Sequence, residues 1–245
     1  MLEKINLLEI GFSNVTPEEV LEYIVKSLKK SSKKYYVVTP NPEILVIASN
    51  DEFYTKVLNS AKIALADGAG VVWASKFLGK PLKHRITGVD LLEKLCEGVA
   101  EKPITVGFLG GGPKIAETTA ECLKGKYPGL KVTFASSEFH NHESITKIPA
   151  TDILFVAFGS PKQEIWIYEN LNRLSVKVVI GVGGAFDFIS GKVKRAPLWV
   201  RSLGFEWLFR LIIQPWRIKR QISLVTFILL VFKERFFTKS IKPRK

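Results

Sequence analysis

The apolar positions of this chain gather in short runs, and each run ends abruptly in small and polar residues. The runs lie at 35–38, 63–66, 104–109, 153–158 and 178–180. Each is unbroken by polar residues and too short for a helix, as expected for a strand buried on both faces. In a parallel sheet the polar tips of such strands meet at one edge, where helix N-termini point amide hydrogens at bound anions. The pattern therefore predicts a sheet edge suited to a nucleotide-type ligand.

Helix-like segments alternate with these strands. After a first strand around 5–11, Thr16 and Glu19 form a capping box that begins a helix. The remaining elements are helices over 43–60, 67–77, 87–99, 113–126 and 161–174, with a strand near 132–135. This alternation predicts an α/β fold, a Rossmann-like and mostly parallel sheet with helices on both faces. We assign it to a catalytic domain at 1–195.

The last fifty residues differ in character and predict a C-terminal helical appendage at 196–245. An aromatic-rich helix is expected over 197–213, and a second one over 215–237, because Pro215 interrupts the first. The second helix contains 11 uncharged residues, 222–232, flanked by basic ones. A bilayer span needs about 20 apolar residues. The appendage is therefore expected to lie on a membrane and not to cross it.

The cysteine content and the N-terminal sequence favour a location inside the cell. The only cysteines are Cys96 and Cys122, both in helix-like segments, so a disulfide framework is not expected and a reducing compartment is favoured. The N-terminus lacks a basic segment followed by an apolar one, so no secretory signal is predicted. We expect a cytoplasmic protein that associates peripherally with the inner face of the cell membrane.

Charge is concentrated at the C-terminal end. Residues 1–191 carry 22 basic against 21 acidic side chains, whereas 192–245 carry 14 against 2, so the overall net charge of +13 belongs almost entirely to this C-terminal segment. Such asymmetry indicates an anionic partner at that end of the molecule. A membrane surface, a phosphate-bearing ligand and a nucleic acid all fit this charge.

Polar residues at the predicted strand ends are candidates for catalysis. Asp67 follows the 63–66 strand, where a carboxylate is placed to take a proton from a substrate hydroxyl as a general base. An Asp-Gly turn or a helix N-cap is the structural alternative. Thr39 and Asn41 lie at a neighbouring tip and either cap a helix or bind a sugar or phosphate oxygen. Gln163 begins a helix at the same edge and has the same two interpretations.

Residues at the ends of two further predicted strands suggest ligand binding but do not indicate a nucleotide cofactor. Gly110 and Gly111 begin a glycine run that permits close approach of a diphosphate to backbone amides, but the run is not the spaced dinucleotide fingerprint. Asp187 follows the last strand among apolar residues, where it contacts a base or serves as a cap. No cofactor is expected.

The sequence does not favour a metal site. No Asp-x-Asp pair is present, His84 stands alone, and His140 and His142 lie in a polar loop. A departing nucleoside diphosphate would then need cationic side chains and helix N-termini. Candidates are Arg210, Arg217 and Arg220, of which the last two share one helix face. A basic face resting on anionic lipid is the alternative.

Taken together and in order, several motifs resemble the WecG/TagA/CpsF glycosyltransferase family, most closely its TagA branch, over about residues 5–220. They are Thr39-Pro40-Asn41-Pro42-Glu43, Ala66-Asp67-Gly68, the segment 84–90 around Arg85, the segment 159–164, the segment 181–187 and Arg195-Ala196-Pro197.

The resemblance implies an inverting, metal-independent transfer of N-acetylmannosamine from UDP-ManNAc to the 4-hydroxyl of GlcNAc in undecaprenyl-diphosphate-GlcNAc. The product is the linkage disaccharide of wall teichoic acid. It further implies that Asp67 is the base, with Thr39, Asn41 and Gln163 in the pocket. Arg85 is expected to bind substrate within its motif, and the resemblance places the appendage arginines at the diphosphates.

Three alternatives remain open from the sequence. Another UDP-sugar, such as UDP-ManNAcA or UDP-glucose, fits the same motifs. A nucleic-acid-binding protein fits the basic appendage, but its charges alternate with Leu, Ile, Phe and Trp, so we expect a membrane partner and no nucleic acid. A nicotinamide-dependent oxidoreductase fits the fold but lacks the fingerprint. A homo-oligomer also remains open.

Overall fold

The computed structural model describes residues 2–30, 33–137, 145 and 148–237. Its centre is a six-stranded sheet in the order β4-β3-β8-β7-β5-β6, and all the paired strands run parallel. The strands are β3 (Tyr35–Val38), β4 (Ile63–Ala64), β5 (Thr105–Gly110), β6 (Lys131–Ser136), β7 (Thr151–Ala157) and β8 (Val176–Gly181). The predicted α/β fold with a parallel sheet is confirmed.

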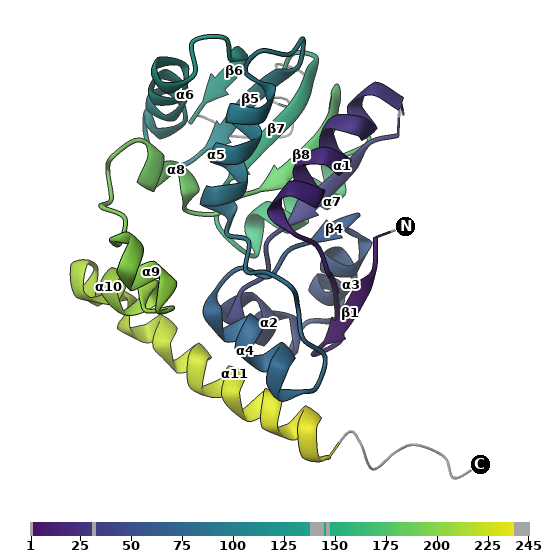
Figure 1. The fold of residues 1–245 in the computed structure, drawn as a ribbon, viewed down its shortest axis with the longest axis vertical. Coiled ribbons are helices and arrows are strands. Elements are labelled where there is room, and N and C mark those ends of the chain that lie inside the picture. Colours follow the sequence, from purple (N-terminus) through teal and green to yellow (C-terminus); the bar gives the residue numbers. More distant parts are fainter. Residues whose placement is uncertain (1, 31–32, 138–144, 146–147, 238–245) are drawn as a thin grey trace.

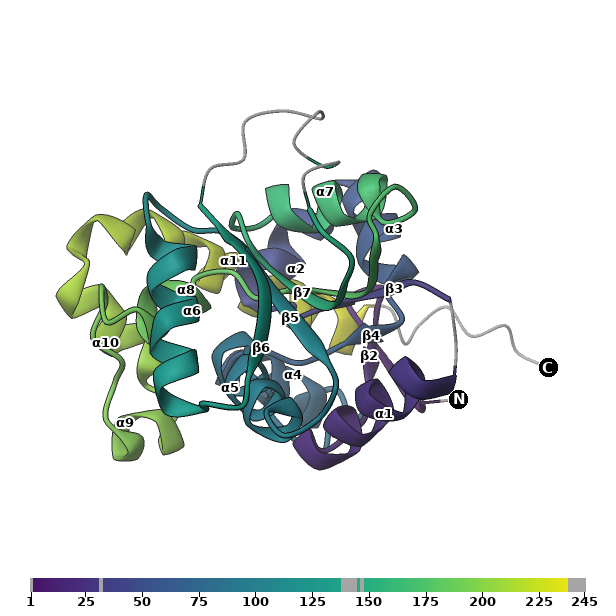
Figure 2. The ribbon, with the colours of Figure 1, turned by 90° about the horizontal axis from the view of Figure 1, so that it is seen from above.

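Helices cover both faces of this sheet (Figure 1). On one face lie α1 (Pro17–Lys30), α5 (Gly88–Val99), α6 (Ile115–Lys126) and α8 (Ala185–Ile189). On the other lie α2 (Pro42–Ala48), α3 (Glu52–Ser60), α4 (Ala69–Phe77) and α7 (Lys162–Asn170). Figure 2 shows the sheet edge-on between α3 and α7 on one side and α1 and α5 on the other.

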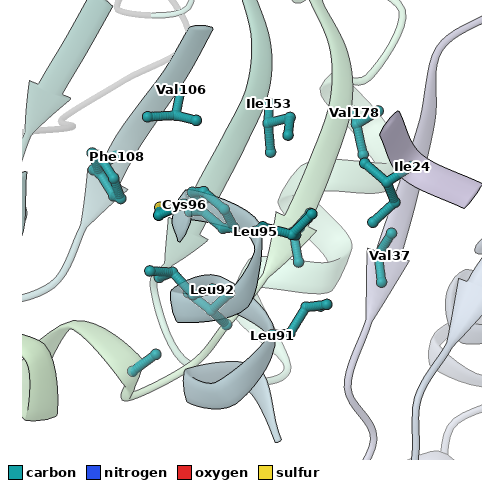
Figure 3. Packing of buried hydrophobic residues seen from close by; sticks show 14 of the residues in the cluster. Ile24, Val37, Leu91, Leu92, Leu95, Cys96, Val106, Phe108, Ile153 and Val178 are labelled. Carbon is teal, nitrogen blue, oxygen red and sulfur yellow. The ribbon is translucent and has the colours of Figure 1, made fainter. Parts of the chain in front are cut away.

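The two faces form two hydrophobic clusters because successive side chains of a strand point to opposite sides. Ile153 and Phe155 of β7 belong to the first cluster, and Leu154 and Val156 to the second. Figure 3 shows the first cluster, in which α5 packs its apolar side chains onto the strands. Each fully buried side chain of this kind contributes about 1.5–3 kcal/mol, so the strands and the helices that pack on them stabilise the fold together.

The capping box predicted at the start of α1 is present. The Thr16 backbone N–H donates to Glu19 Oε2 (2.8 Å), and the Glu19 N–H donates to Thr16 Oγ1 (3.2 Å). Both contacts satisfy amides that have no partner within the helix. The local signal thus decides where this helix begins.

The predicted single strand over 5–11 is wrong. Residues Lys4–Leu7 form β1 and Ile10–Ser13 form β2, an antiparallel pair outside the main sheet. The two residues between them, Leu8 and Glu9, have φ of 47° and 66°. Two left-handed residues are what a two-residue type I′ hairpin requires, but neither is a glycine or asparagine, so the turn was not visible in the sequence.

The predicted helix over 43–60 is two helices. The chain leaves α2 after Ala48 and begins α3 at Glu52, and the Asp51 side chain accepts a hydrogen bond from the Tyr54 N–H (2.9 Å) as an N-cap. Asparagine and aspartate side chains compete with helical hydrogen bonding, which favours a break here. The predicted helix over 161–174 is also shorter in the structure, where α7 ends at Asn170.

In the described part of the appendage, residues 196–237, three α-helices and a short 3₁₀ helix are present where two helices were predicted. The helix expected over 197–213 divides into α9 (Leu198–Ser202) and α10 (Glu206–Ile213). Between them Gly204 has a φ of +80°, and a Cβ built on it would lie 2.8 Å from the Ala69 Cβ. The chain therefore turns at the one residue that allows both the left-handed backbone and the close approach.

The second appendage helix is confirmed and packs on the same chain. After a short turn, η2 (Pro215–Arg217), helix α11 (Ile218–Phe236) lies along α2 and α4 (Figure 1). Its Phe227 and Val231 are buried in the second cluster, and Glu234 pairs with Lys80 (3.1 Å). No helix among the described residues is long and apolar enough to cross a membrane. The domain division at residue 195 stays a prediction.

Candidate active site

The carboxyl ends of β3 and β8 frame a crevice. These strands are neighbours, but the chain leaves β3 for α2 on one face and leaves β8 for α8 on the other. Such a divergence is the usual ligand position in an open α/β sheet. The Thr39 hydroxyl joins the two strand ends by donating to the Gly181 carbonyl oxygen (3.2 Å).

A cavity of about 1290 Å³ occupies this crevice. It is bordered by the segments that follow β3, β4, β5, β7 and β8 and by the appendage helices α10 and α11. The structure thus brings together most of the site residues that the sequence predicted. Those that line the cavity are Thr39, Asn41, Asp67, Arg85, Gly111, Gln163, Asp187 and Arg210.

Three predicted residues are not among the lining. Gly110 lies behind it, where a Cβ would come within 2.7 Å of the Phe158 ring, so glycine there accommodates packing. The side chains of Arg217 and Arg220 lie outside the described part of the chain. His140 and His142 also lie outside it.

Asp67 comes three residues after the end of β4. It lies in the cavity wall and is partly exposed. Its Oδ2 accepts a hydrogen bond from the Gly88 N–H at the start of α5 (3.4 Å). Helix α4, which follows Asp67, begins at Ala69, and the N-cap residue Gly68 provides no side-chain cap. The carboxylate therefore does not cap its own helix, whereas Gly68 has a φ of +101° and the predicted alternative of an Asp-Gly turn stays open.

The surroundings of Asp67 raise its pKa to about 7. Burial is the largest cause, because it penalises the charged form. The Gly88 amide and Arg85 oppose the shift, while the negative charges of Glu206 and Asp90 reinforce it. A carboxyl with a pKa near neutrality is matched to general base catalysis.

This pKa predicts the pH dependence of any reaction in which Asp67 is the base. The ionised form is the active one, so kcat/KM is expected to fall about tenfold per pH unit below about 7 and to level off above it. A pH–rate profile measures this directly. A profile that stays flat from about pH 5 to about pH 8 would indicate an ordinary carboxyl and contradict the expectation.

Asn41 and Gln163 have structural contacts as well as positions in the lining. Asn41 Oδ1 accepts from the Ile44 N–H (3.0 Å) and so caps α2. Gln163 Oε1 accepts from the Gly183 N–H (3.0 Å), which ties the segment after β7 to the one after β8. The capping predicted as an alternative for Asn41 is thus present, and its contact with substrate stays a prediction.

A buried carboxylate fixes the orientation of Gln163. Glu164 is fully buried, and its Oε1 accepts from Gln163 Nε2 (2.6 Å) and from the Ser160 hydroxyl (2.8 Å). Its Oε2 accepts from the Tyr54 hydroxyl (2.9 Å). Burial raises the pKa of Glu164, and these hydrogen bonds oppose the shift. Because a carboxylate only accepts, the Gln163 amide nitrogen must face it and the oxygen must face Gly183.

Cationic side chains from four segments border the cavity, Arg85 among them. Arg210 of α10 lies 4.7 Å from the Phe188 ring centre, and a Cβ on Gly184 would be 2.9 Å from its Nη2. Lys162 and Lys192 also line the cavity, although sequence reasoning did not select them. Their only sequence signal was their position, Lys162 beside the predicted Gln163 and Lys192 shortly after Asp187.

The appendage is joined to the site by a cluster of ion pairs. Arg195 contacts Asp90 (2.7 Å), Glu93 (3.8 Å) and Glu206 (3.5 Å), and Arg201 contacts Asp90 at 3.8 Å. Hydrogen bonds and these arginines hold the pKa of Asp90 below its usual value despite its burial. The cluster places Glu206 of α10 in the cavity wall near Asp67.

Within the described ranges, no three His, Cys, Asp or Glu side chains are grouped as a metal site would need. The site therefore offers a partly buried carboxyl with a raised pKa, several cations and a sheet edge with helix N-termini. This set of groups is suited to transferring a group from a phosphate-bearing donor to a hydroxyl.

Comparison with known proteins agrees with this class. Residues 5–241 match the Glycosyl transferase WecG/TagA/CpsF family. Similar curated proteins are N-acetylglucosaminyldiphosphoundecaprenol N-acetyl-beta-D-mannosaminyltransferases. That of Bacillus spizizenii is 35% identical, covering 94% of this chain and 90% of its own length. That of Bacillus subtilis is 35% identical over 96% and 93%, and that of Staphylococcus aureus strain MRSA252 is 33% identical over 98% and 96%.

The chain belongs to the WecG/TagA/CpsF glycosyltransferase family. It is an enzyme of the hexosyltransferase class.

Proposed function

We propose that this enzyme transfers N-acetylmannosamine from UDP-ManNAc to the 4-hydroxyl of GlcNAc in undecaprenyl-diphosphate-GlcNAc. The product would be the linkage disaccharide of wall teichoic acid. The observation that carries the proposal is the position of Asp67, a carboxyl with a raised pKa in a cavity between the sheet edge and the appendage. The names of relatives matched over nearly their whole length support the choice of substrates.

The proposed reaction is a single displacement. Asp67 takes the proton of the acceptor hydroxyl as its oxygen forms a bond to the anomeric carbon of the donor sugar. The bond from that carbon to the phosphate oxygen breaks on the opposite side, and UDP leaves with the electron pair. The transition state has oxocarbenium character, and attack opposite the leaving group inverts the anomeric centre. Holding both substrates in line removes much of the entropic barrier.

The side chains of Arg210, Lys162 and Lys192 are proposed to stabilise the departing diphosphate. All three line the cavity, and preorganised cations in such a site stabilise charge that develops in the transition state. Arg85 and Asp187 are proposed to bind substrate, and Thr39, Asn41 and Gln163 to shape the pocket. Arg217 and Arg220 remain proposed diphosphate ligands on the strength of the sequence alone.

If these cations replace a divalent ion, transfer is expected to persist in excess EDTA. Turnover of the purified protein should stay within about twofold after metal chelation, because the cationic side chains and not a metal ion stabilise the negative charge of the leaving diphosphate. The assay compares initial rates with and without chelator, and with added magnesium. An absolute requirement for magnesium would contradict metal independence.

We further propose that the appendage rests on the inner face of the cell membrane, which would place the pocket beside a lipid-borne acceptor. Segment 192–245 has a net charge of +12, and each basic residue near an anionic surface contributes about 1 kcal/mol. Large apolar side chains exposed on its helices suit an interfacial position. Among them are Leu198, Trp199, Leu203, Ile212, Trp216 and Ile222.

The donor is tested with a panel of UDP-sugars and a lipid-diphosphate-GlcNAc analogue. Transfer with UDP-ManNAc, and much slower transfer with UDP-ManNAcA and UDP-glucose, is the expected result. A preference for either of the other two sugars would reassign the donor within the same family. Transfer from none of them would refute the proposed activity.

A further inference from the structure

One side of the cavity has an apolar mouth. Four side chains from three helices border the cavity there: Trp73 of α4, Trp207 of α10, and Leu224 and Ile228 of α11. Trp73 is 42% exposed, Trp207 45% and Ile228 38%, so these three also reach the outer surface. The same side chains thus face both the cavity and the surroundings of the molecule. We call this set the apolar rim.

The rim is built by a close contact between the appendage and the body. A Cβ on Gly70 would lie 3.6 Å from the Phe227 ring and 2.9 Å from Pro42, so α4 and α11 approach closely at the base of the rim. Leu224 and Ile228 are four residues apart, which places them on one face of α11 with Phe227 beside them. Trp73 stacks on Phe77 (5.4 Å between ring centres), which supports its indole at the mouth.

The interior of the cavity has the opposite character. Asp67, Arg85 and Arg210 line it and are more buried than Trp73, Trp207 and Ile228, and they supply charge for a diphosphate and a sugar. A cavity with charged groups inside and large apolar side chains at its mouth fits an amphiphile whose polar head enters first.

The rim also continues into an exposed apolar stripe on α11. Ile222, Val225 and Leu229 follow at helical spacing and are exposed beside it. A chain leaving the cavity over the rim would therefore remain on apolar protein surface. The same surface is the one proposed to meet the membrane.

We propose that the apolar rim binds the first isoprene units of the acceptor's polyprenyl chain and guides the chain from the cavity to the bilayer. This inference rests on the proposed function, because it takes the acceptor to be a polyprenyl diphosphate. It adds a lipid subsite, made by Trp73, Trp207, Leu224 and Ile228, to the sugar and diphosphate sites inside the cavity.

The test compares two acceptors with the same GlcNAc-diphosphate head, one carrying a farnesyl chain and the other a methyl group, without vesicles or detergent. The wild-type kcat/KM for the farnesyl acceptor is expected to exceed that for the methyl acceptor at least about tenfold, the effect of burying only a few methylene groups. In Trp73→Ser and in Ile228→Ser this ratio is expected to fall most of the way to one.

Phe53→Ser is the matched control for Trp73→Ser. Phe53 of α3 is an aromatic side chain about as exposed as Trp73 (45% against 42%), but it does not line the cavity and lies outside the appendage. Its variant is expected to keep the wild-type ratio of the two kcat/KM values. Because the ratio compares two acceptors within one variant, a change in the amount of folded protein cancels from it.

Several outcomes would overturn the lipid subsite. A wild-type ratio near one would do so, as would equal ratios in Trp73→Ser and Phe53→Ser. Weaker vesicle binding by Ile228→Ser with an unchanged ratio would assign the rim to bilayer lipid, and an altered sedimentation mass with an unchanged ratio would assign it to a second copy of the chain. Transfer to neither acceptor would instead refute the proposed function itself.

Discussion

Replacing Asp67 with asparagine is expected to lower the rate of sugar transfer about 10³-fold while leaving the affinity for UDP nearly unchanged. The amide keeps the size of the side chain but cannot take the proton from the acceptor hydroxyl. The measurement pairs steady-state turnover with UDP binding by calorimetry. Turnover close to that of the wild type would remove Asp67 from the role of base.

The stability of this variant separates chemistry from folding. The pKa of Asp67 is raised in the folded protein, so the native state loses stability as the pH rises from about 4, the carboxyl's ordinary pKa, to about 7, and the full loss is present at pH 8. Asp67→Asn should therefore be at least as stable as the wild type at pH 8, as judged by Tm. Asp51→Asn is a matched control, because Asp51 caps α3 outside the cavity lining and asparagine caps a helix equally well. Its turnover is expected to be unchanged.

Removing residues 196–245 is expected to lower turnover more than about a hundredfold and to abolish binding to anionic vesicles. The deletion takes Glu206, Trp207 and Arg210 from the cavity wall and removes the exposed apolar helices. The body should remain folded, because the sheet and most of both hydrophobic clusters lie before residue 196. Its Tm should fall, since the space filled by Phe227 and Val231 opens to water.

A shorter deletion that ends the chain at Phe237 serves as the control. It keeps every appendage residue that lines the cavity, so turnover with a water-soluble acceptor is expected to match that of the full chain. Circular dichroism and thermal melting establish that both truncated chains are folded. A 1–195 chain with full activity would contradict a role for the appendage in the site and would leave the cavity wall of α10 and α11 without a function.

Local signals in the sequence were enough for the sheet and for much of the site. Strands such as β7 can be recognised in the sequence by an unbroken apolar run, because both of their faces are buried. Asp67 and Thr39 could be placed near each other because the carboxyl ends of parallel strands share one edge of the sheet. The capping box at Thr16 was likewise predictable from residues three apart.

What the sequence left out depends on neighbours far along the chain. The break at Gly204 reflects its approach to Ala69, a contact between residues that no local pattern connects. Trp73 and Ile228 likewise line the cavity because α11 packs against the part of the chain that precedes the appendage. The buried Glu164, which accepts a hydrogen bond from Gln163, also accepts one from Tyr54 of α3. No local pattern connects Tyr54 with Glu164.

The anomeric configuration of the product tests the central claim most directly. Purified enzyme, UDP-ManNAc and a soluble GlcNAc-diphosphate acceptor would be incubated, and the disaccharide analysed by NMR. A base acting on the acceptor hydroxyl in one displacement predicts a β-linked ManNAc on the 4-oxygen of GlcNAc, inverted relative to the α-linked donor. An α-linked product would require two displacements at that carbon, and would contradict a mechanism in which Asp67 acts as the base.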